Sequence, residues 1–291
     1  MIRFLLDKLE ESPRRKLVKK IAVRIFSVAH LVLRGIPGGN RCFVCNARLV
    51  VLARSVMDKK LIEDSRLNPQ WVEFFDQREG EICISCGASL RVRQLALAFV
   101  YWINERKGLR ESTALSIVQF SATKSLRIAE INSCGALHKI LSVLPDLKYS
   151  EYQPDRPDIS HEDIQNLTYT DGEFDLVLHS DTLEHVPDID RALNEIYRVL
   201  KPGGATIFTV PVVRDGRKTI VRAALKSNGE INHLLPPSFH GGSYQKTCQY
   251  LVFYEFGEDF LSLLGNAGFR ITLLEHPANP AAVVITATKS L

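Results

Sequence analysis

The chain has 291 residues, of which 45% are apolar and 24% are charged, a composition typical of globular proteins. This length allows one large domain and a smaller one, with an ample core. No apolar run approaches the roughly 18 residues that a membrane span requires, and no small-residue cleavage site follows the first apolar stretch. We therefore expect a cytoplasmic protein.

Positive charge is concentrated at the start of the chain. The net charge of the whole chain is +4, but residues 1–41 carry +7 and the remainder −3. Residues 14–34 repeat apolar side chains at helical spacing, with lysines and arginines on the other faces. Such a helix either packs on protein or lies on an anionic membrane surface. We predict a basic amphipathic leader helix within residues 1–40, with peripheral membrane contact as a hypothesis.

Four of the six cysteines form two C-x-x-C pairs, Cys42 with Cys45 and Cys83 with Cys86. In a reducing compartment this spacing favours Zn²⁺, because both thiolates of each tight turn can face one point. Four protein ligands leave no open position on the metal, so the zinc would be structural. A redox pair is the alternative, although the flanks lack the setting of a thioredoxin-type motif. We predict a zinc-binding module and linking helix over residues 41–110.

The linking helix is predicted from the sequence "SLRVRQLALAFVYWINERKG", residues 89–108, which has helical periodicity and ends at a glycine. Arg91 and Arg93 lie in its first turn. We expect these two arginines to form ion pairs at the surface.

From about residue 125 the sequence alternates apolar strands with helices. This alternation predicts an α/β fold with a doubly wound, mostly parallel sheet, in which ligands bind at the carboxyl ends of the strands. A turn is predicted at "KPGG", residues 201–204, and a short strand is predicted to end at Glu162 and Asp163. The other predicted strands are 126–131, 147–152, 174–180, 205–211, 270–275 and 282–288, and the helices are 136–144, 188–200 and 257–269.

Three acidic residues, Glu130, Glu151 and Asp163, close three successive predicted strands. Glu151 follows Glu130 by 21 residues, close to the spacing at which a carboxylate meets the ribose hydroxyls of a nucleotide. That carboxylate would accept both hydroxyl hydrogens, and Asp163 would accept from an adenine amino group. Charged residues also close strands because strand ends are wet, but three in order favour an adenosine ligand.

The loop after the first strand departs from the usual nucleotide-binding pattern. It reads Asn132, Ser133, Cys134, Gly135 and Ala136, with one glycine where two or three are usual. None of these residues is bulky, and asparagine tolerates a positive φ better than most residues. The loop is either a cofactor loop built from small polar residues or the remnant of one in a non-catalytic scaffold. The acidic residues downstream favour the first interpretation.

Residues 174–211, "FDLVLHSDTLEHVPDIDRALNEIYRVLKPGGATIFTVP", resemble the motif block of class I S-adenosylmethionine-dependent methyltransferases. In that family the block supplies the fourth strand, the loop facing the methyl acceptor, a helix and the turn into the fifth strand. The similarity extends over roughly residues 113–291, and it implies a Rossmann-like sheet of seven strands. We therefore assign residues 111–291 to a methyltransferase domain, in which residues 212–250 form an acceptor-binding insertion.

The resemblance also implies roles for individual residues. The loop from Glu130 to Gly135 would lie against the methionine part of S-adenosylmethionine, Glu151 would take the ribose hydroxyls, and Asp163 would contact the adenine. The implied cofactor-binding residues are Glu130, Ile131, Asn132, Ser133, Cys134, Gly135, Glu151, Tyr152, Asp163, Ile164, Ser180 and Asp181.

Two histidines are candidates for a catalytic base. Methyl transfer is an in-line displacement that needs alignment and, for a hydroxyl acceptor, removal of one proton. A histidine with a pKa near neutrality suits that task. His185 in "LEHV" would face the acceptor, although it equally suits a hydrogen-bonding role in its loop, and His240 lies in the acceptor-binding insertion.

The upstream cysteine pattern resembles a zinc-binding leader on some members of this family. The segments "EYQPD", "HEDIQNL" and "LLPPSFHG" resemble a subgroup that accompanies glycan biosynthesis. The leading hypothesis is therefore O-methylation of a sugar in surface polysaccharide biosynthesis, with a small-molecule or glycan-linked acceptor. The alternatives are an RNA methyltransferase, disfavoured because the chain beyond residue 41 is net acidic, and a non-catalytic scaffold.

Overall fold

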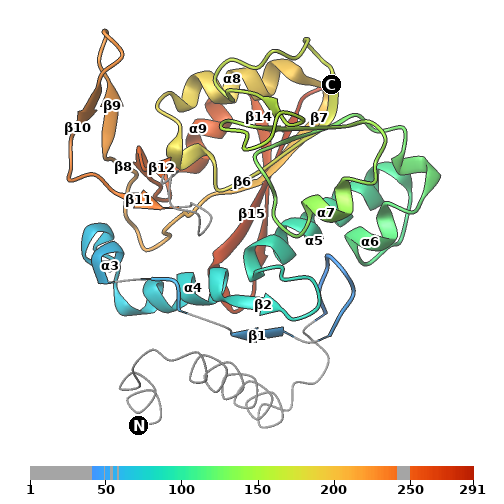
Figure 1. Ribbon diagram of the computed structural model, residues 1–291, viewed down its shortest axis with the longest axis horizontal. Helices are drawn as coiled ribbons and strands as arrows, with labels where there is room; N and C mark the ends of the chain where they lie inside the picture. Colours follow the sequence, from blue (N-terminus) through green and yellow to red (C-terminus); the bar gives the residue numbers. More distant parts are fainter. Residues whose placement is uncertain (1–40, 49, 53–54, 58, 241–249) are drawn as a thin grey trace.

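The computed structural model describes residues 41–48, 50–52, 55–57, 59–240 and 250–291 (Figure 1). The predicted leader helix at residues 14–34 lies outside the described residues, and so does its hypothetical membrane contact. Among the described residues, no helix combines the length and the apolar character needed to cross a bilayer.

A seven-stranded sheet with the order β14-β15-β7-β6-β3-β4-β5 forms the centre of the molecule. Neighbouring strands from β5 to β7 pair in parallel, while β15 runs antiparallel to both β7 and β14. The predicted doubly wound, mostly parallel sheet of seven strands is confirmed. The strands are β3 Ile128–Ile131, β4 Leu147–Glu151, β5 Ser160–His161, β6 Phe174–Ser180, β7 Leu200–Thr209, β14 Phe269–His276 and β15 Asn279–Lys289.

Helices cover both faces of this sheet, because its strands are apolar on both sides (Figure 1). In β6, Leu176 and Leu178 pack with the helices of one face, while Val177 between them packs on the other face. The first face carries α5 Leu90–Lys107, α6 Ala114–Ile117 and α7 His138–Leu141, and the second carries α8 Ile189–Val199 and α9 Phe260–Asn266.

The longest of these helices, α5, has clear start and stop signals. The Ser89 side chain accepts a hydrogen bond from the backbone N–H of Val92, and Gly108 ends the helix in a left-handed conformation with φ +65°. The prediction of this helix is confirmed. The helix predicted over residues 136–144 is reduced to the four residues of α7, because the chain turns at Gly135 before it and enters β4 soon after it.

Two local predictions are wrong. Residues 201–204 do not form a free turn but lie within β7, which follows α8 directly and shifts its register against β6. Gly203 has a φ of +72°, and a Cβ on Gly204 would lie 3.0 Å from the backbone oxygen of Asp175, so this bulge requires both glycines. The strand predicted to end at Asp163 is β5, which ends earlier, at His161.

The cysteine-bearing segment shares its core with the sheet. It contains β1 Val50–Leu52, α3 Lys59–Ser65, α4 Pro69–Gly80 and β2 Glu81–Cys83, and β1 pairs antiparallel with β2. Cys42 and Cys83 belong to the same buried cluster as Leu95 of α5 and Ile128 of β3. Residues 41–110 therefore pack as part of the larger body, and the domain boundary at 110/111 stays a prediction.

The segment after β7 forms short strands over the carboxyl edge of the sheet. The pair β8–β13 is antiparallel, β9–β10 forms a hairpin, and β11 pairs with β12. Phe253 donates its backbone N–H to the Glu184 carbonyl at 2.8 Å, which ties the segment to the loop after β6. These strands are β8 Ile220–Val221, β9 Ala223–Leu225, β10 Ile231–His233, β11 Phe239–His240, β12 Tyr250–Leu251 and β13 Tyr254–Glu255.

Candidate functional site

The loop after β3 is shaped by Asn132, whose φ of +58° lies in the left-handed region. Its backbone N–H donates to the Ser150 carbonyl at 2.9 Å. Its side-chain oxygen accepts the backbone N–H of Tyr152 at 3.0 Å, and its side-chain amide lies 3.4 Å from the Thr182 hydroxyl. Asn132 therefore supplies the backbone conformation that a glycine would supply, and it also links the loops after β3, β4 and β6.

Glu130 holds the same loop from inside the protein. It is fully buried in β3; its Oε1 accepts the backbone N–H of Cys134 at 2.8 Å, and its Oε2 lies 2.7 Å from His138 Nδ1. This hydrogen bond raises the pKa of His138, because the carboxylate of Glu130 favours the positively charged imidazolium. Both carboxylate oxygens of Glu130 thus contact protein groups. The predicted contact of Glu130 with the cofactor stays a prediction.

Glu151 lies at the end of β4, beside that loop. Its Oε1 accepts the backbone N–H of Ser133 at 3.3 Å and the hydroxyl of Tyr149. The Tyr149 ring in turn packs on His138 at 4.1 Å between ring centroids. Glu151 is half-buried at the carboxyl edge of the sheet, so this network orients its carboxylate while part of it remains accessible.

The remaining predicted adenosine contacts lie further along the same edge. Tyr152 is 45% exposed, and its ring centroid is 5.8 Å from that of His161. Asp163 lies in a turn where its Oδ1 accepts the backbone N–H of Gln165 at 2.9 Å, while Ile164 is buried in the core. The structure thus brings these residues to one edge, and their contact with a cofactor stays a prediction.

Asp181, directly after β6, is the centre of a partly buried ionic network. Both terminal nitrogens of Arg78 donate to its carboxylate at 2.7 Å, and Thr209 donates to Oδ1 at 2.8 Å. Arg91 Nε lies 3.3 Å from Oδ2, and Arg91 also donates to Ser180. Burial opposes ionisation of Asp181, but the two guanidinium charges outweigh it and hold its pKa well below the usual range.

The side chain of Glu184 lies beside this network. Its side chain is fully buried, and neither carboxylate oxygen has a hydrogen-bond partner among the described residues. Burial, and then the charge of Asp181, raise its pKa well above the usual range. Burial therefore favours the protonated, neutral form of this carboxyl group.

His185 follows in the same short helix, Leu183–His185. Its Nδ1 lies 3.0 Å from the Leu251 carbonyl, so Nδ1 carries the proton, and its Nε2 lies 3.8 Å from Glu184 Oε1. Burial lowers the pKa of His185, which favours the neutral imidazole that a base requires. The base role stays a prediction for His185, and for His240 as well, whose side chain lies outside the described part of the chain.

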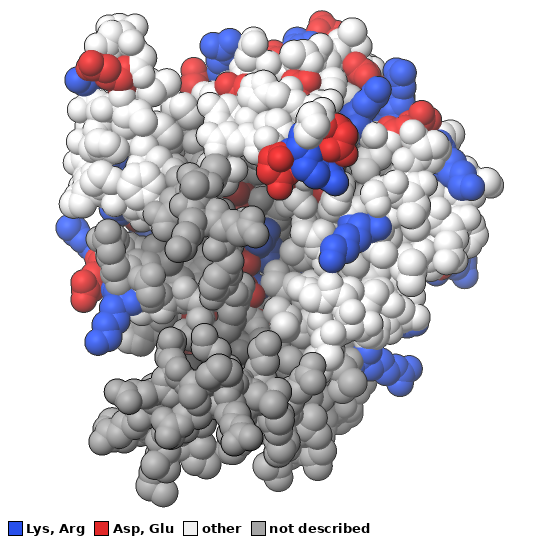
Figure 2. All heavy atoms as spheres, in the orientation of Figure 1, with Lys and Arg blue, Asp and Glu red and all other residues white. Residues whose placement is uncertain are grey.

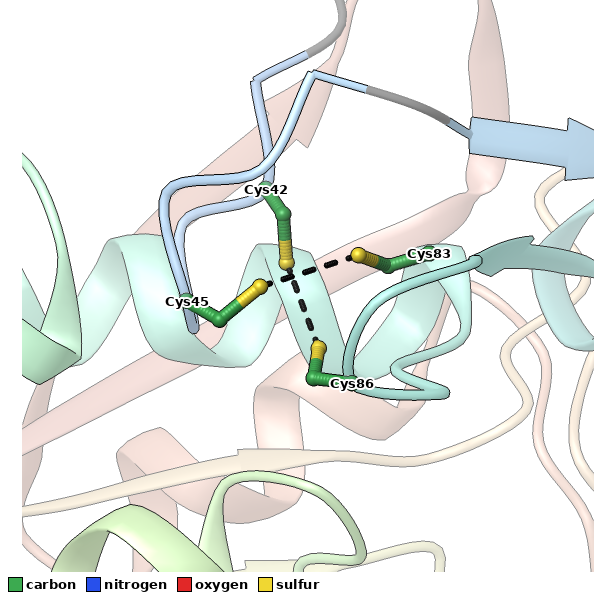
Figure 3. A group of neighbouring side chains, drawn as sticks. All are labelled: Cys42, Cys45, Cys83 and Cys86. Carbon is green, nitrogen blue, oxygen red and sulfur yellow. Dashed lines mark hydrogen bonds between the residues drawn. The ribbon is translucent and has the colours of Figure 1, made fainter.

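The four predicted metal ligands converge from two turns (Figure 3). The sulfur atoms are 3.6 Å apart for Cys42 and Cys86 and 3.7 Å apart for Cys45 and Cys83, and all four lie within 4.8 Å of one another. A tetrahedral zinc with Zn–S bonds of about 2.3 Å requires sulfur separations of roughly 3.8 Å. The four thiols therefore fit such an ion.

The two cysteine turns share one backbone design. Asn46 has a φ of +72° directly after Cys45, and Gly87 has a φ of +78° directly after Cys86. In each turn the first cysteine accepts a hydrogen bond from the residue in this conformation, at 2.8 Å in both cases. The repetition positions both sulfurs of each pair on the same side of their turn.

Sequence reasoning missed Arg78 and misjudged Arg91 and Arg93. Both arginines form the predicted ion pairs, Arg91 with Glu79 and Arg93 with Glu81. Arg93 is 5% exposed and the side chain of Arg91 is 20% exposed, so the predicted position at the surface is wrong. These arginines are buried because α4 and α5 pack against β15 and the sheet edge. The one available signal was the adjacent opposite charges of Arg78 and Glu79 near Cys83, which do not reveal a partner in a distant loop.

The order of the sheet, with antiparallel β15 inserted between β7 and β14, defines a Rossmann-like methyltransferase fold. Residues 142–208 match the family model "Methyltransferase domain". This match begins directly after α7 and ends near the end of β7. The central part of the chain therefore matches a methyltransferase domain in sequence, and it lies in a sheet of the corresponding order.

Curated relatives match over part of the chain. The sarcosine/dimethylglycine N-methyltransferase of Halorhodospira halochloris is 36% identical over 91 residues, which are 31% of this chain and 31% of that protein. The demethylmenaquinone methyltransferase of Clavibacter sepedonicus is 29% identical over 136 residues, 45% of this chain and 53% of that protein. The chain thus spans between about a third and about a half of the length of these relatives.

A solved structure of an S-adenosylmethionine-dependent methyltransferase from Mesorhizobium loti is also similar. It is 18% identical, covers 60% of this chain and 96% of its own, and has a TM-score of 0.37. A TM-score of this size does not define a fold, which is defined here by the sheet order.

Replacing Asn132 tests whether its backbone conformation matters. Asn132→Ala keeps a Cβ at positive φ, loses the side-chain bridge and tolerates this conformation less well than asparagine, whereas Asn132→Gly loses the bridge but suits the conformation. We expect the alanine variant to be less stable than the glycine variant by about 1 kcal/mol, measured by urea denaturation. Equal stability of the two variants would contradict the role of the left-handed conformation.

Glu184 should make stability depend on pH. Its pKa is raised in the folded state, so the folded protein holds the proton that the unfolded chain releases above pH of about 4.3. The free energy of unfolding should therefore fall as pH rises from this value towards the folded pKa. Glu184→Gln keeps the shape without the titration, so its stability should fall less steeply between pH 5 and 8. Parallel pH profiles would refute the raised pKa.

Proposed function

We propose that the protein is an S-adenosylmethionine-dependent methyltransferase with a structural Zn²⁺. The observation that carries the proposal is the loop after β3, closed on Glu130 and Asn132, beside the accessible Glu151 at the carboxyl edge of a methyltransferase sheet. In parallel α/β sheets this edge is where a nucleotide-containing ligand binds. The match of residues 142–208 to a methyltransferase domain supports the same conclusion.

The residues at this edge suit the cofactor chemically. Glu151 would accept the ribose hydroxyls, and the turn at Asp163 and Ile164 would meet the adenine. Asn132 and Gly135 both have a positive φ, which lets the loop turn sharply. None of the loop residues has a bulky side chain where the methionine part would lie. When bound, S-adenosylmethionine supplies an electrophilic methyl group on a sulfonium, so the chain itself has to provide alignment and, for some acceptors, a base.

Neutral His185 is the proposed base for a hydroxyl acceptor. The Leu251 carbonyl holds the proton on Nδ1, which leaves the lone pair on Nε2. The negative charge of Asp181 would favour protonation of Nε2 during the reaction. Leu251 lies in β12 directly after Tyr250, the last residue of the acceptor-binding insertion, so this end of the insertion would also orient the base.

The acceptor class is a hypothesis that an acceptor screen must decide. The segments that resemble a subgroup accompanying glycan biosynthesis support a sugar hydroxyl as the acceptor. The names of the two relatives point instead to an amine and a quinone, and such acceptors belong in the same screen. An RNA acceptor has less support, because basic and acidic side chains are interspersed on the face seen in Figure 2.

Calorimetric titration with S-adenosylmethionine tests the cofactor proposal. We expect saturable binding by the wild type and a loss of about 10- to 100-fold in affinity for Glu151→Ala, since charge-assisted hydrogen bonds contribute about 1.5–3 kcal/mol. Glu230→Ala, which removes an exposed carboxylate from the β9–β10 hairpin, is the matched control and should bind normally. Folded wild-type protein without detectable binding would favour a scaffold and refute the enzyme.

Metal analysis tests the zinc proposal. We expect about one zinc per chain in the purified protein, since four thiolates complete the coordination of a structural ion. Cys86→Ser should lose the metal and lower the thermal stability, because metal binding and folding are coupled. Cys134→Ser, which changes a buried free cysteine outside the cluster, should keep the metal. A folded wild-type protein without zinc would refute the site.

A further inference from the structure

We propose that Arg78 and Arg91 are positioning residues that couple the cysteine cluster to the loop Asp181–His185, so that cofactor affinity depends on the cluster. The inference rests on the proposed function. It assigns the cysteine-bearing segment a part in the site, beyond stabilising its own fold.

The two arginines flank one of the cysteine turns. Arg78 lies in the last turn of α4 and Arg91 in the first turn of α5. Between them the chain forms β2 and the turn that carries Cys83 and Cys86. The geometry of this turn therefore sets the separation and direction of the two guanidinium groups. A metal ion bound to both cysteines would hold the turn in one conformation.

Glu79 links the two arginines to each other. Its Oε1 accepts from Arg78 Nη1 at 2.5 Å and from Arg91 Nε at 2.8 Å. With Asp181 the group contains two cations and two anions, so its charges balance without another ion. Arg78 is 1% exposed, and the side chain of Arg91 is 20% exposed. A displaced partner would leave an uncompensated charge in the protein interior, so the group favours one arrangement.

The network reaches the cofactor loop through the residues next to Asp181. Asp181 has a φ of +47°, and its backbone N–H donates to the Thr209 carbonyl at 2.9 Å, so Arg78 holds a residue in a sparsely populated conformation. Ser180 before it receives the hydrogen bond from Arg91. Thr182 after it contacts the Asn132 amide at 3.4 Å. A shift of Asp181 would therefore move the partner of Asn132 as well.

The same loop carries the proposed base. Glu184 and His185 lie three and four residues after Asp181, in the short helix Leu183–His185. The backbone joins Cys83 and Cys86 to both arginines. Side-chain contacts then lead from the arginines through Asp181 and its neighbours to the cofactor loop, and the chain continues into the short helix with the proposed base. Such a chain of buried, charge-balanced contacts transmits a change at one end when the other end has few alternative arrangements.

A set of variants separates positioning from simple stabilisation. Arg78→Met should weaken S-adenosylmethionine binding at least 10-fold and lower the melting temperature. The double variant Arg78→Met with Glu79→Leu removes one charge of each sign and keeps Asp181, and it should regain melting temperature while its affinity stays low. Recovery of affinity together with stability would show a merely structural role and overturn the proposal. Arg91→Gln, on a more exposed side chain, gives the same test with a smaller effect on folding.

The matched control is Arg106→Met. Arg106 lies on α5, like Arg91, and pairs at 3.3 Å with Asp175, which lies in β6 at the opposite end of the strand from Asp181. This variant removes an arginine–aspartate pair between the same two elements, but at the amino edge of the sheet. It should bind the cofactor as the wild type does. A comparable loss of affinity in Arg106→Met would overturn the assignment to the carboxyl edge.

The dependence on the cluster is measured by hydrogen–deuterium exchange. Removing metal with a chelator, or the change Cys86→Ser, should speed amide exchange in residues 180–186, and added Zn²⁺ should reverse this only in the wild type. Unchanged exchange in these residues would overturn the coupling. If the wild type fails to bind S-adenosylmethionine, the proposed function fails, whereas this exchange experiment still decides the coupling.

Discussion

The bidentate ion pair between Arg78 and Asp181 is the interaction on which the site depends most. It joins the end of α4 to the end of β6, two segments separated by 103 residues in the sequence. Removing one partner of a buried pair typically costs about 3–5 kcal/mol, because the other charge is left uncompensated. The pair therefore determines how the cysteine-bearing segment sits on the sheet, and it holds the backbone of Asp181 at positive φ.

The loop after β3 forms its turn with a single glycine. The requirement at its first position is a left-handed backbone conformation, and Asn132 meets it with a side chain that also bridges two neighbouring loops. Glu130, His138 and Tyr149 then support the loop from behind. The departure from the glycine-rich pattern replaces flexibility with a hydrogen-bonded framework, so it is not by itself a sign of lost function.

Local patterns predicted the elements well where they reflected local physics. The period of two in the strands, the Ser89 cap and the Gly108 stop of α5 depend on neighbouring residues, and these predictions are confirmed. The glycines at 203 and 204 were misinterpreted as a turn, because the bulge in β7 exists only through pairing with β6. For the site, the predicted residues lie together at one edge, but their contact with a cofactor remains to be measured.

The sequence by itself determined the alternation of strands and helices, the mostly parallel α/β architecture and the spacing of four cysteines in two turns, while the number of seven strands was implied by the family resemblance. Periodicity and spacing are properties of the chain, so they can be read without coordinates. Only the tertiary structure decided that Arg78 and Arg91 meet Asp181, and that Glu184 is buried without a hydrogen-bond partner among the described residues. Ion pairing and burial depend on which distant segments meet, and no local pattern encodes that.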